Sequence, residues 1–146
     1  MKVRDVMTAE PVTCGPDDPC AQAATLMRQE DCGSIPVVRD GSLVGIVTDR
    51  DIVVRAIAAG KDPRTTAVSE VMSADPITIA PDADAAEAAR VMADRQVRRL
   101  PVVDGGRLVG IVVTAQLARS EPPREVGDTM KEISEPASGK GSHARG

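Results

Sequence analysis

The chain has 146 residues, 42% of them hydrophobic and 27% charged, which is enough for one ordinary domain or two small halves that share a core. With 18 basic and 22 acidic side chains the net charge is −4, which argues against a nucleic-acid partner but allows one local phosphate site. No apolar run approaches the roughly 18 residues of a membrane span, and the N-terminus has no apolar stretch of signal-peptide type, so we expect a cytoplasmic protein without a membrane partner.

Aromatic residues are absent and histidine nearly so. The sequence has no Phe, Tyr or Trp, and its one histidine is His143. Nucleic-acid sites that stack bases on aromatic rings are therefore not expected. Catalysis by a positioned imidazole and metal sites built on several histidines are excluded as well. Because a Walker-type phosphate loop and a nucleophile–base pair are also missing, we expect no enzyme, no metal site and no obligatory cofactor.

The sequence repeats itself after 65 residues without a gap. Residues 3–54 and 68–119 are identical at 21 of 52 aligned positions, which chance does not produce. The shared motifs are Val-x-x-Val-Met, Pro-Val-Val and Leu-Val-Gly-Ile-Val. Two copies indicate one duplicated, pseudo-symmetric domain and are too few for a solenoid.

Each copy has a short apolar stretch, residues 11–14 or 76–79, which we expect to be a strand. A helix follows, with Asp18 as the expected cap of the first copy and Pro19 as the first helical residue. Its apolar side has the helical spacing i, i+3, i+4, i+7 in both copies. These positions are Cys20, Ala23, Ala24 and Met27, and in the second copy Ala85, Ala88, Ala89 and Met92.

Two apolar β-branched runs then predict a hairpin. In the first copy they span residues 35–38 and 43–48 around Asp40-Gly41, and the second hairpin turns at residues 104–106. A second helix follows and is expected to end at Gly60. Its expected core-facing residues are Ile52, Val53, Ala56 and Ile57. The order in each copy is therefore β-α-β-β-α.

The predicted boundaries follow the repeat. Repeat 1 covers residues 1–60, a linker covers 61–67, and repeat 2 covers 68–120. Residues 121–146 form a C-terminal tail of different composition. In this tail we expect a short helix over residues 125–133, followed by a disordered Gly/Ser-rich end.

From about Val3 to Arg119, the chain resembles the tandem cystathionine-β-synthase (CBS) domain family, often called the Bateman module. The resemblance rests on the ordered, duplicated motifs and on the run Gly-Ile-Val-Thr-Asp-Arg-Asp at residues 45–51. It implies an α/β (α+β) fold in which two β-α-β-β-α CBS repeats pack with pseudo-two-fold symmetry. It also implies a homodimer, because such modules commonly pair.

The same resemblance implies a function. Family members bind adenosine-containing ligands such as AMP, ADP, ATP or S-adenosylmethionine in clefts between the repeats, and act as sensors. We therefore expect a regulatory signal-transduction module that binds an adenine nucleotide, has no catalytic activity and acts on an effector protein that the sequence does not identify. The alternative is a ligand-free dimeric scaffold or interaction module.

The candidate site is the Gly-x-x-Thr-x-x-Asp motif of Gly45, Thr48 and Asp51, which also contains Asp49. A strand ends and a helix begins here, so we expect unpaired backbone N–H groups and the positive helix end to face a phosphate. The Thr48 hydroxyl can donate to a phosphate oxygen, and the Asp51 carboxylate can accept from both ribose hydroxyls; family members use these residues in the same way. The alternative is a capping box between Thr48 and Asp51, with Asp51 paired to Arg55. For Thr48 the two interpretations are compatible.

The second copy departs from this motif. Val113 stands in place of Thr48 and Gln116 in place of Asp51, while Thr114 can still cap the helix. Loss of a charged acceptor to the ribose costs on the order of 1.5–3 kcal/mol, which is about ten- to a hundredfold in affinity. We therefore predict one competent nucleotide site per chain, in repeat 1.

The resemblance adds further candidate residues. Arg98 and Arg99 precede the Leu-Pro strand of the second copy, where family members often place basic residues on ligand phosphates. The alternative is a solvated or interface arginine, for instance one paired with Asp94. The first copy has Gly33 and Ser34 here, which leave room for a ligand. The expected walls around an adenine are Thr13 and the backbone of Ile35, Pro36 and Val37.

Three cysteines, Cys14, Cys20 and Cys32, show neither a CxxC motif nor zinc-ligand spacing. Their counterparts in the second copy are all apolar, namely Ile79, Ala85 and Val97. We therefore interpret the cysteines as small buried hydrophobic residues. Thiol sensing is the alternative.

Overall fold

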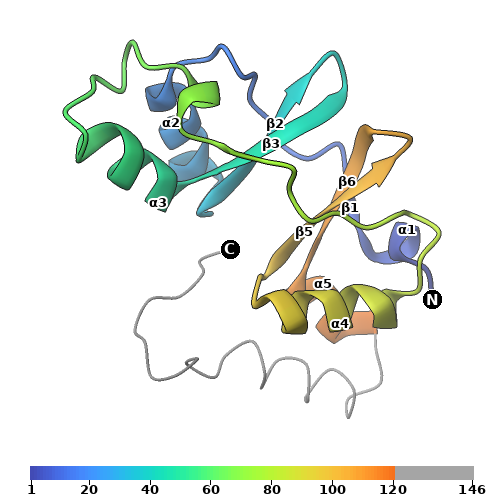
Figure 1. Cartoon of the computed structure of the whole chain (residues 1–146). Coiled ribbons are helices and arrows are strands. Elements are labelled where there is room, and N and C mark those ends of the chain that lie inside the picture. Colours follow the sequence, from blue (N-terminus) through green and yellow to red (C-terminus); the bar gives the residue numbers. More distant parts are fainter. Residues whose placement is uncertain (121–146) are drawn as a thin grey trace, which may run out of the picture. The chain divides into compact units, whose positions relative to one another are not determined.

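Figure 1 shows the computed structural model, which describes residues 1–120, with side chains through residue 117. The chain forms two compact units. Unit 1 contains Met1–Pro11, Ile77–Gly105 and the chain from Val109 onward, and unit 2 contains Val12–Pro76 and Gly106–Leu108. The helix predicted over residues 125–133 and the disorder predicted after it lie outside the described residues.

Unit 2 is built mainly on the first repeat. Its elements are α2 (Cys20–Glu30), β2 (Ser34–Arg39), β3 (Ser42–Thr48), α3 (Asp49–Ile52), a π-helical turn η1 (Val53–Ile57), a 3-10 turn η2 (Val68–Glu70) and β4 (Ser73–Ala74). Strands β2 and β3 form an antiparallel hairpin with a bulge between Val37 and Val38. Strand β4 pairs antiparallel with β3, so β3 is the inner strand of these three.

Unit 1 is built mainly on the second repeat. Its elements are α1 (Val3–Val6), β1 (Thr8–Ala9), α4 (Ala85–Arg95), β5 (Arg99–Asp104), β6 (Arg107–Val113) and α5 (Thr114–Ser120). Strand β6 pairs with β5, and antiparallel with β1. The predicted fold class, two repeats of helices with an antiparallel sheet, is therefore confirmed. None of the described helices is long and apolar enough to cross a membrane.

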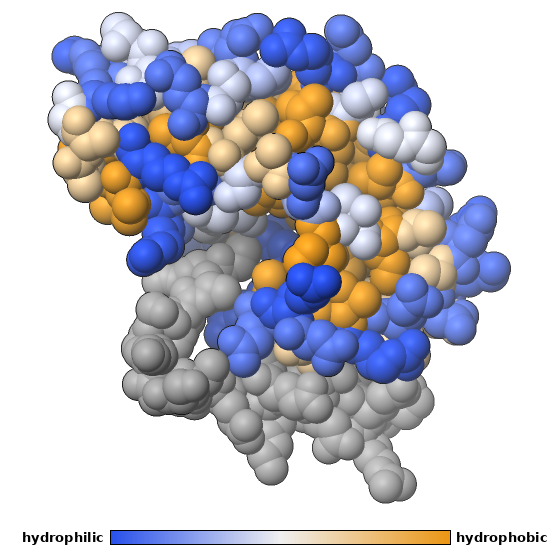
Figure 2. Space-filling view, viewed as in Figure 1, coloured by the Kyte–Doolittle hydropathy of each residue, from blue (hydrophilic) through white to orange (hydrophobic). Residues whose placement is uncertain are grey.

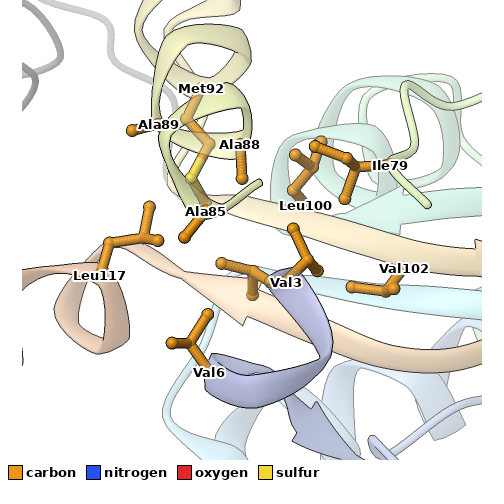
Figure 3. Packing of buried hydrophobic residues seen from close by; sticks show 11 residues of the cluster. Val3, Val6, Ile79, Ala85, Ala88, Ala89, Met92, Leu100, Val102 and Leu117 are labelled. Atoms are coloured by element: carbon orange, nitrogen blue, oxygen red, sulfur yellow. The ribbon is translucent and has the colours of Figure 1, made fainter. Parts of the chain in front are cut away.

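Each unit takes a short leading segment from the other repeat. Helix α1, at the start of repeat 1, places Val3 and Val6 in the core of unit 1 among residues of repeat 2 (Figure 3). Correspondingly, Val68 and Val71 at the start of repeat 2 lie in the core of unit 2 among residues of repeat 1. The compact units thus differ from the sequence repeats by the exchange of these leading segments.

The long helix of each unit buries one apolar face. In α4 all four predicted positions are buried, namely Ala85, Ala88, Ala89 and Met92. In α2 the buried face is narrower, because Ala24 is exposed and its prediction is wrong. The predicted cap is also wrong: Pro19 is the N-cap of α2, and the Asp18 carboxylate instead accepts the Gly15 N–H at 2.8 Å, which closes the preceding turn.

Both hairpin turns are confirmed. Asp40 and Gly41 have φ angles of 52° and 84°, the two left-handed residues that a type I′ turn requires. In the second hairpin, Gly105 and Gly106 have φ angles of 59° and 86°. The backbone twist of such a turn matches the twist of the two strands that it connects.

The strand predicted at the start of each copy is almost absent. Of residues 11–14 only Cys14 joins a sheet, through an isolated parallel bridge to Val37. Of residues 76–79 only Ile79 does so, through an equivalent bridge to Val102. The prolines that open both stretches have no N–H to donate, so a longer ladder cannot begin there.

The second helix of repeat 1 begins as α3 and continues as the π-helical turn η1. Ile52 and Ala56 are buried as predicted. Val53 and Ile57 are 56% and 52% exposed, so the prediction for these two is wrong. The π turn interrupts the 3.6-residue period on which that prediction rests. The helical segment ends at Ile57, and Gly60, with a φ of 78°, closes the turn that follows by donating its N–H to the Ile57 carbonyl at 3.0 Å.

A glycine in the middle strand of each unit lets the exchanged segment approach closely. A Cβ atom on Gly45 in β3 would lie 2.7 Å from the Met72 sulfur and 2.8 Å from the Ser73 carbonyl oxygen. A Cβ atom on Gly110 in β6 would meet the Met7 side chain and lie 2.9 Å from the Thr8 carbonyl oxygen. Both glycines are therefore required by packing.

A Gly45→Ala substitution is expected to lower the free energy of unfolding by about 1–3 kcal/mol, because backbone as well as side chain must move. Gly15→Ala is the matched control, since its Cβ would meet nothing closer than 3.6 Å, and it should stay within about 0.5 kcal/mol of wild type. Urea unfolding of the three proteins measures the difference. Equal destabilisation by both substitutions would contradict the close approach at Gly45.

Candidate functional site

Thr48 and Asp51 meet where β3 ends and α3 begins. Thr48 is the extended N-cap residue, with a φ of −114° and a ψ of 164°. Its backbone N–H donates to Asp51 Oδ2 at 3.0 Å, and the Asp51 N–H donates to Thr48 Oγ1 at 3.0 Å. These reciprocal bonds are a capping box, so the capping interpretation of the motif is confirmed.

Asp51 is buried, with 8% of its surface exposed, and also faces Arg55 one turn along the helix. The Arg55 Nη1 atom lies 3.7 Å from Asp51 Oδ1, which is the predicted pairing. The same nitrogen donates to the carbonyl oxygen of Val71 at 2.9 Å. The carboxylate is thus held by the helix start through one oxygen and by a guanidinium through the other.

The expected row of unpaired N–H groups at the start of α3 is wrong. The Asp49 N–H donates to the Gly33 carbonyl at 3.0 Å, and the Arg50 N–H donates to the Asp49 side chain at 2.8 Å. The Asp51 N–H is taken by Thr48. The polar groups that the motif can still offer a ligand are the donor proton of the Thr48 hydroxyl, the Asp51 Oδ1 lone pairs and the second oxygen of the exposed Asp49 carboxylate.

The remaining residues predicted in repeat 1 lie in different environments. Gly45 has the packing role described above. Its counterpart Gly110 has the same role in repeat 2, where the Thr and Asp of the motif are replaced. Ile35 and Val37 have their side chains in the core of unit 2, so only their backbone can face a ligand. Pro36 is buried as well, and its carbonyl accepts from the Cys14 N–H at 3.1 Å. Thr13 is exposed.

In repeat 2 a glutamine replaces the capping box. The Val113 N–H donates to Gln116 Oε1 at 2.9 Å, which is the bond that Asp51 accepts in repeat 1. The Gln116 side-chain amide also donates to the Thr8 hydroxyl in β1. Helix α5 begins at Thr114 itself, so Thr114 is not the residue before the helix and the expected cap by Thr114 is wrong; its hydroxyl donates to the Arg98 carbonyl at 3.4 Å. The repeat register could have identified Gln116 as the side chain that accepts at the helix start, because it aligns with Asp51.

Arg98 and Arg99 stand at the start of β5 in unit 1. The Arg98 carbonyl accepts the Thr114 N–H at 3.1 Å, just as the Gly33 carbonyl accepts from Asp49. Arg98 is exposed and Arg99 is half-buried. No ion pair among the described residues includes either arginine, and the suggested pairing with Asp94 is absent from them. The sequence thus puts a hydroxyl and an acid beside one helix start and two guanidinium groups beside the other.

Two of the three cysteines are buried, as expected for small hydrophobic residues. Cys14 and Cys20 are buried in the core of unit 2, whereas Cys32 is half-buried and its sulfur lies 3.4 Å from the Ser34 carbonyl oxygen. Burial raises the pKa of the Cys14 thiol to about 12, and the Asp18 charge adds to this effect. Burial also raises the pKa of Cys20. Both thiols are therefore neutral and unreactive near pH 7.

The model of the CBS domain family matches this chain twice, over residues 3–57 and 68–121. The chain belongs to the CBS domain family. It is 43% identical over 133 residues to the CBS domain-containing protein YhcV of Bacillus subtilis, covering 90% of this chain and 94% of that protein. It is 38% identical to hypoxic response protein 1 of Mycobacterium tuberculosis, covering 91% and 94%.

Solved CBS structures resemble this CBS pair as well. A crystal structure of Hypoxic Response Protein I with two coordinated zinc ions matches with a TM-score of 0.76 at 39% identity, covering 84% of this chain and all of that one. CBSX2, a CBS-pair protein from Arabidopsis thaliana, matches in its complex with AMP with a TM-score of 0.71 at 26% identity, covering 82% and 94%. Inosine-5′-monophosphate dehydrogenases match over only 21% of their length.

The raised pKa of Cys14 predicts a loss of stability in alkali. The unfolded thiol, with its ordinary pKa of 9.0, loses its proton at lower pH than the folded thiol, whose pKa is about 12. Between these values the unfolded state binds fewer protons, so the free energy of unfolding falls as pH rises above about 9. Urea unfolding at pH 7.5, 9 and 10 under reducing conditions measures this slope, and Cys14→Val should flatten it. Identical slopes would show that Cys14 ionises freely in the folded state.

Proposed function

We propose that this CBS pair is a regulatory module that binds an adenosine-containing ligand at Thr48 and Asp51 and signals to an effector protein without catalysing a reaction. The proposal depends on the burial of Asp51 and on the partners of its two carboxylate oxygens. Asp51 is a buried carboxylate that shares one oxygen with the helix cap and keeps the second oxygen at 3.7 Å from its only charged partner among the described residues. Such an oxygen is suited to accept hydrogen bonds from ribose hydroxyls. The AMP complex of the relative CBSX2 supports an adenosine ligand.

Each residue of the motif has a proposed task. Thr48 accepts the Asp51 N–H with its oxygen, which leaves the hydroxyl proton to donate to a phosphate oxygen. The Asp49 carboxylate accepts the Arg50 N–H at the start of the helix and is exposed, so we give it a positioning role. Arg98 is charged and exposed and has no ion pair with the residues that the structure describes, which supports it as a proposed phosphate contact, and Arg99 remains a second candidate.

We propose one high-affinity site per chain. In repeat 2 the ribose-accepting position is Gln116, whose amide already donates to Thr8 and whose carbonyl caps the helix. The hydroxyl position is Val113, which has no polar side-chain atom. Both groups that would hold the ligand are therefore missing or engaged in repeat 2.

We also propose that the protein is a cytoplasmic homodimer. Val53, Val54 and Ile57 are 56%, 46% and 52% exposed on the helical segment formed by α3 and η1. Figure 2 shows apolar atoms over this segment at the left of the view. An assembled relative, the hexameric CBS-CP12 protein of cyanobacteria, matches with a TM-score of 0.68 at 29% identity. Burial of this apolar patch against a second copy would remove it from water.

The second candidate function is a ligand-free dimeric scaffold. The completed capping box favours it, because both Thr48 and Asp51 already have a structural reason to be there. The two candidates differ in one measurable respect, which is whether an adenosine compound binds.

The first experiment asks what the purified protein binds. Because the chain has no Trp or Tyr, an absorbance band near 260 nm comes from a compound that co-purifies with the protein. Mass spectrometry identifies this compound after acid releases it. Calorimetry with AMP, ADP, ATP and S-adenosylmethionine should then give about one high-affinity site per chain for at least one of them. Two equal sites would contradict the proposed asymmetry, and no binding of any compound would favour the scaffold.

Two variants separate ligand binding from helix capping. Asp51→Asn keeps a cap acceptor but removes the charge, so affinity should fall about ten- to a hundredfold. Gln116→Ala is the matched control, because it removes the corresponding cap in repeat 2, costs about 1 kcal/mol of stability and should leave affinity unchanged. Unchanged affinity in Asp51→Asn would remove Asp51 from the site.

Sedimentation tests the proposed dimer. Ile57→Asp should raise the dimer dissociation constant at least about tenfold, because a charge would be buried without a partner. Ile77→Asp is the control, since Ile77 is an exposed apolar residue outside the patch, at 37% exposure, and should leave the dimer intact. A wild-type protein that remains monomeric at high concentration would contradict the dimer itself.

A further inference from the structure

Arg55 connects the candidate site to the segment that repeat 2 contributes to unit 2. Three acceptors surround its Nη1 atom. They are the Val71 carbonyl at 2.9 Å, the Met72 carbonyl at 3.4 Å and Asp51 Oδ1 at 3.7 Å. The two carbonyl oxygens accept the hydrogen bonds of Nη1, whereas Asp51 Oδ1 lies beyond hydrogen-bond distance and attracts the same guanidinium by its charge.

The two carbonyls that Arg55 contacts belong to the segment that leads from the core of unit 2 into β4. Val71 is fully buried in the core of unit 2. Directly after Met72 the chain enters β4, where Ser73 pairs with Ile46 and Ala74 pairs with Gly45. The segment then continues into repeat 2. A change in how Arg55 binds these carbonyls therefore acts on the connection between the two repeats.

Unit 1 has an equivalent connection of a different chemical kind. Gln116 aligns with Asp51, and its amide donates directly to Thr8 in β1, the segment that repeat 1 contributes to unit 1. The position that aligns with Arg55 is Ser120, whose side chain carries no guanidinium. Repeat 1 thus has a charged connection through a guanidinium that also faces a carboxylate, and repeat 2 has a direct neutral one.

We propose that Arg55 is a positioning residue that transmits ligand occupancy at Asp51 to residues 68–74. When ribose hydroxyls donate to Asp51 Oδ1, they weaken the attraction of this carboxylate for the Arg55 guanidinium. The guanidinium then strengthens its hydrogen bonds to the Val71 and Met72 carbonyls, and the segment becomes more strongly held. The ligand-dependent half of this inference rests on the proposed function, whereas the contacts of Arg55 with the segment do not.

Amide hydrogen exchange of the full chain tests the proposal, with AMP as the probe. Without AMP, Arg55→Gln should speed exchange across residues 68–74 roughly three- to tenfold, because the segment loses its side-chain anchor. Arg50→Gln is the matched control, since Arg50 is an exposed arginine on the same helical segment and, within the described part of the chain, forms no hydrogen bond or ion pair with residues 68–74; it should exchange like wild type. Unchanged exchange in Arg55→Gln would overturn the anchor.

Added AMP separates this inference from the proposed function. Wild type and Arg50→Gln should gain protection across residues 68–74, whereas Arg55→Gln should bind AMP within a few-fold of wild-type affinity and gain none there. Arg55→Lys, which keeps the charge but offers a single ammonium, should restore only part of the gain. Binding with equal added protection in Arg55→Gln would overturn the transmission alone. If wild type binds no AMP, the proposed AMP ligand and this transmission fail together, while the exchange without AMP still decides the anchor.

Discussion

The close approach of the exchanged segments to the hairpins is the constraint on which both units depend. Each unit needs a position without a side chain in its middle strand, and Gly45 and Gly110 supply it. With that position open, the leading segment of the other repeat adds a short strand and places two valines in the core. Neither repeat therefore completes its core with its own residues, and a change in one leading segment is a change in the unit of the other repeat.

The candidate site lies beside one of these exchanged segments. Asp51 completes the capping box of α3 and is also the residue that we propose as the ribose acceptor, and the capping box uses only one of its two oxygens. The cap holds the carboxylate in a fixed orientation and keeps it buried, so a ligand would find the second oxygen already in place. The capping and ligand interpretations thus support one another for Asp51 as well as for Thr48.

Sequence reasoning succeeds where a local rule decides the structure. The duplicated motifs specify the family, the apolar spacing of residues 85–92 specifies the buried face of α4, and Asp40-Gly41 specifies a type I′ turn. It fails where an irregular turn or a partner distant in sequence decides. The exposure of Val53 follows from an irregular π turn, and the satisfied N–H of Asp49 follows from the Gly33 carbonyl. The exchange of leading segments has no local signature, although the repeated glycines mark the places where it occurs.

The difference between the repeats has a consequence for how a signal could cross the molecule. A neutral amide that donates to Thr8 offers a ligand no charge to compete for, so the connection in unit 1 is fixed. The connection in unit 2 passes through a half-exposed guanidinium whose partners include a carboxylate and two carbonyls. Under the proposed function, repeat 2 therefore lacks the ligand-binding hydroxyl and acid of repeat 1, and a neutral contact between Gln116 and Thr8 stands where repeat 1 has the charged contact of Arg55.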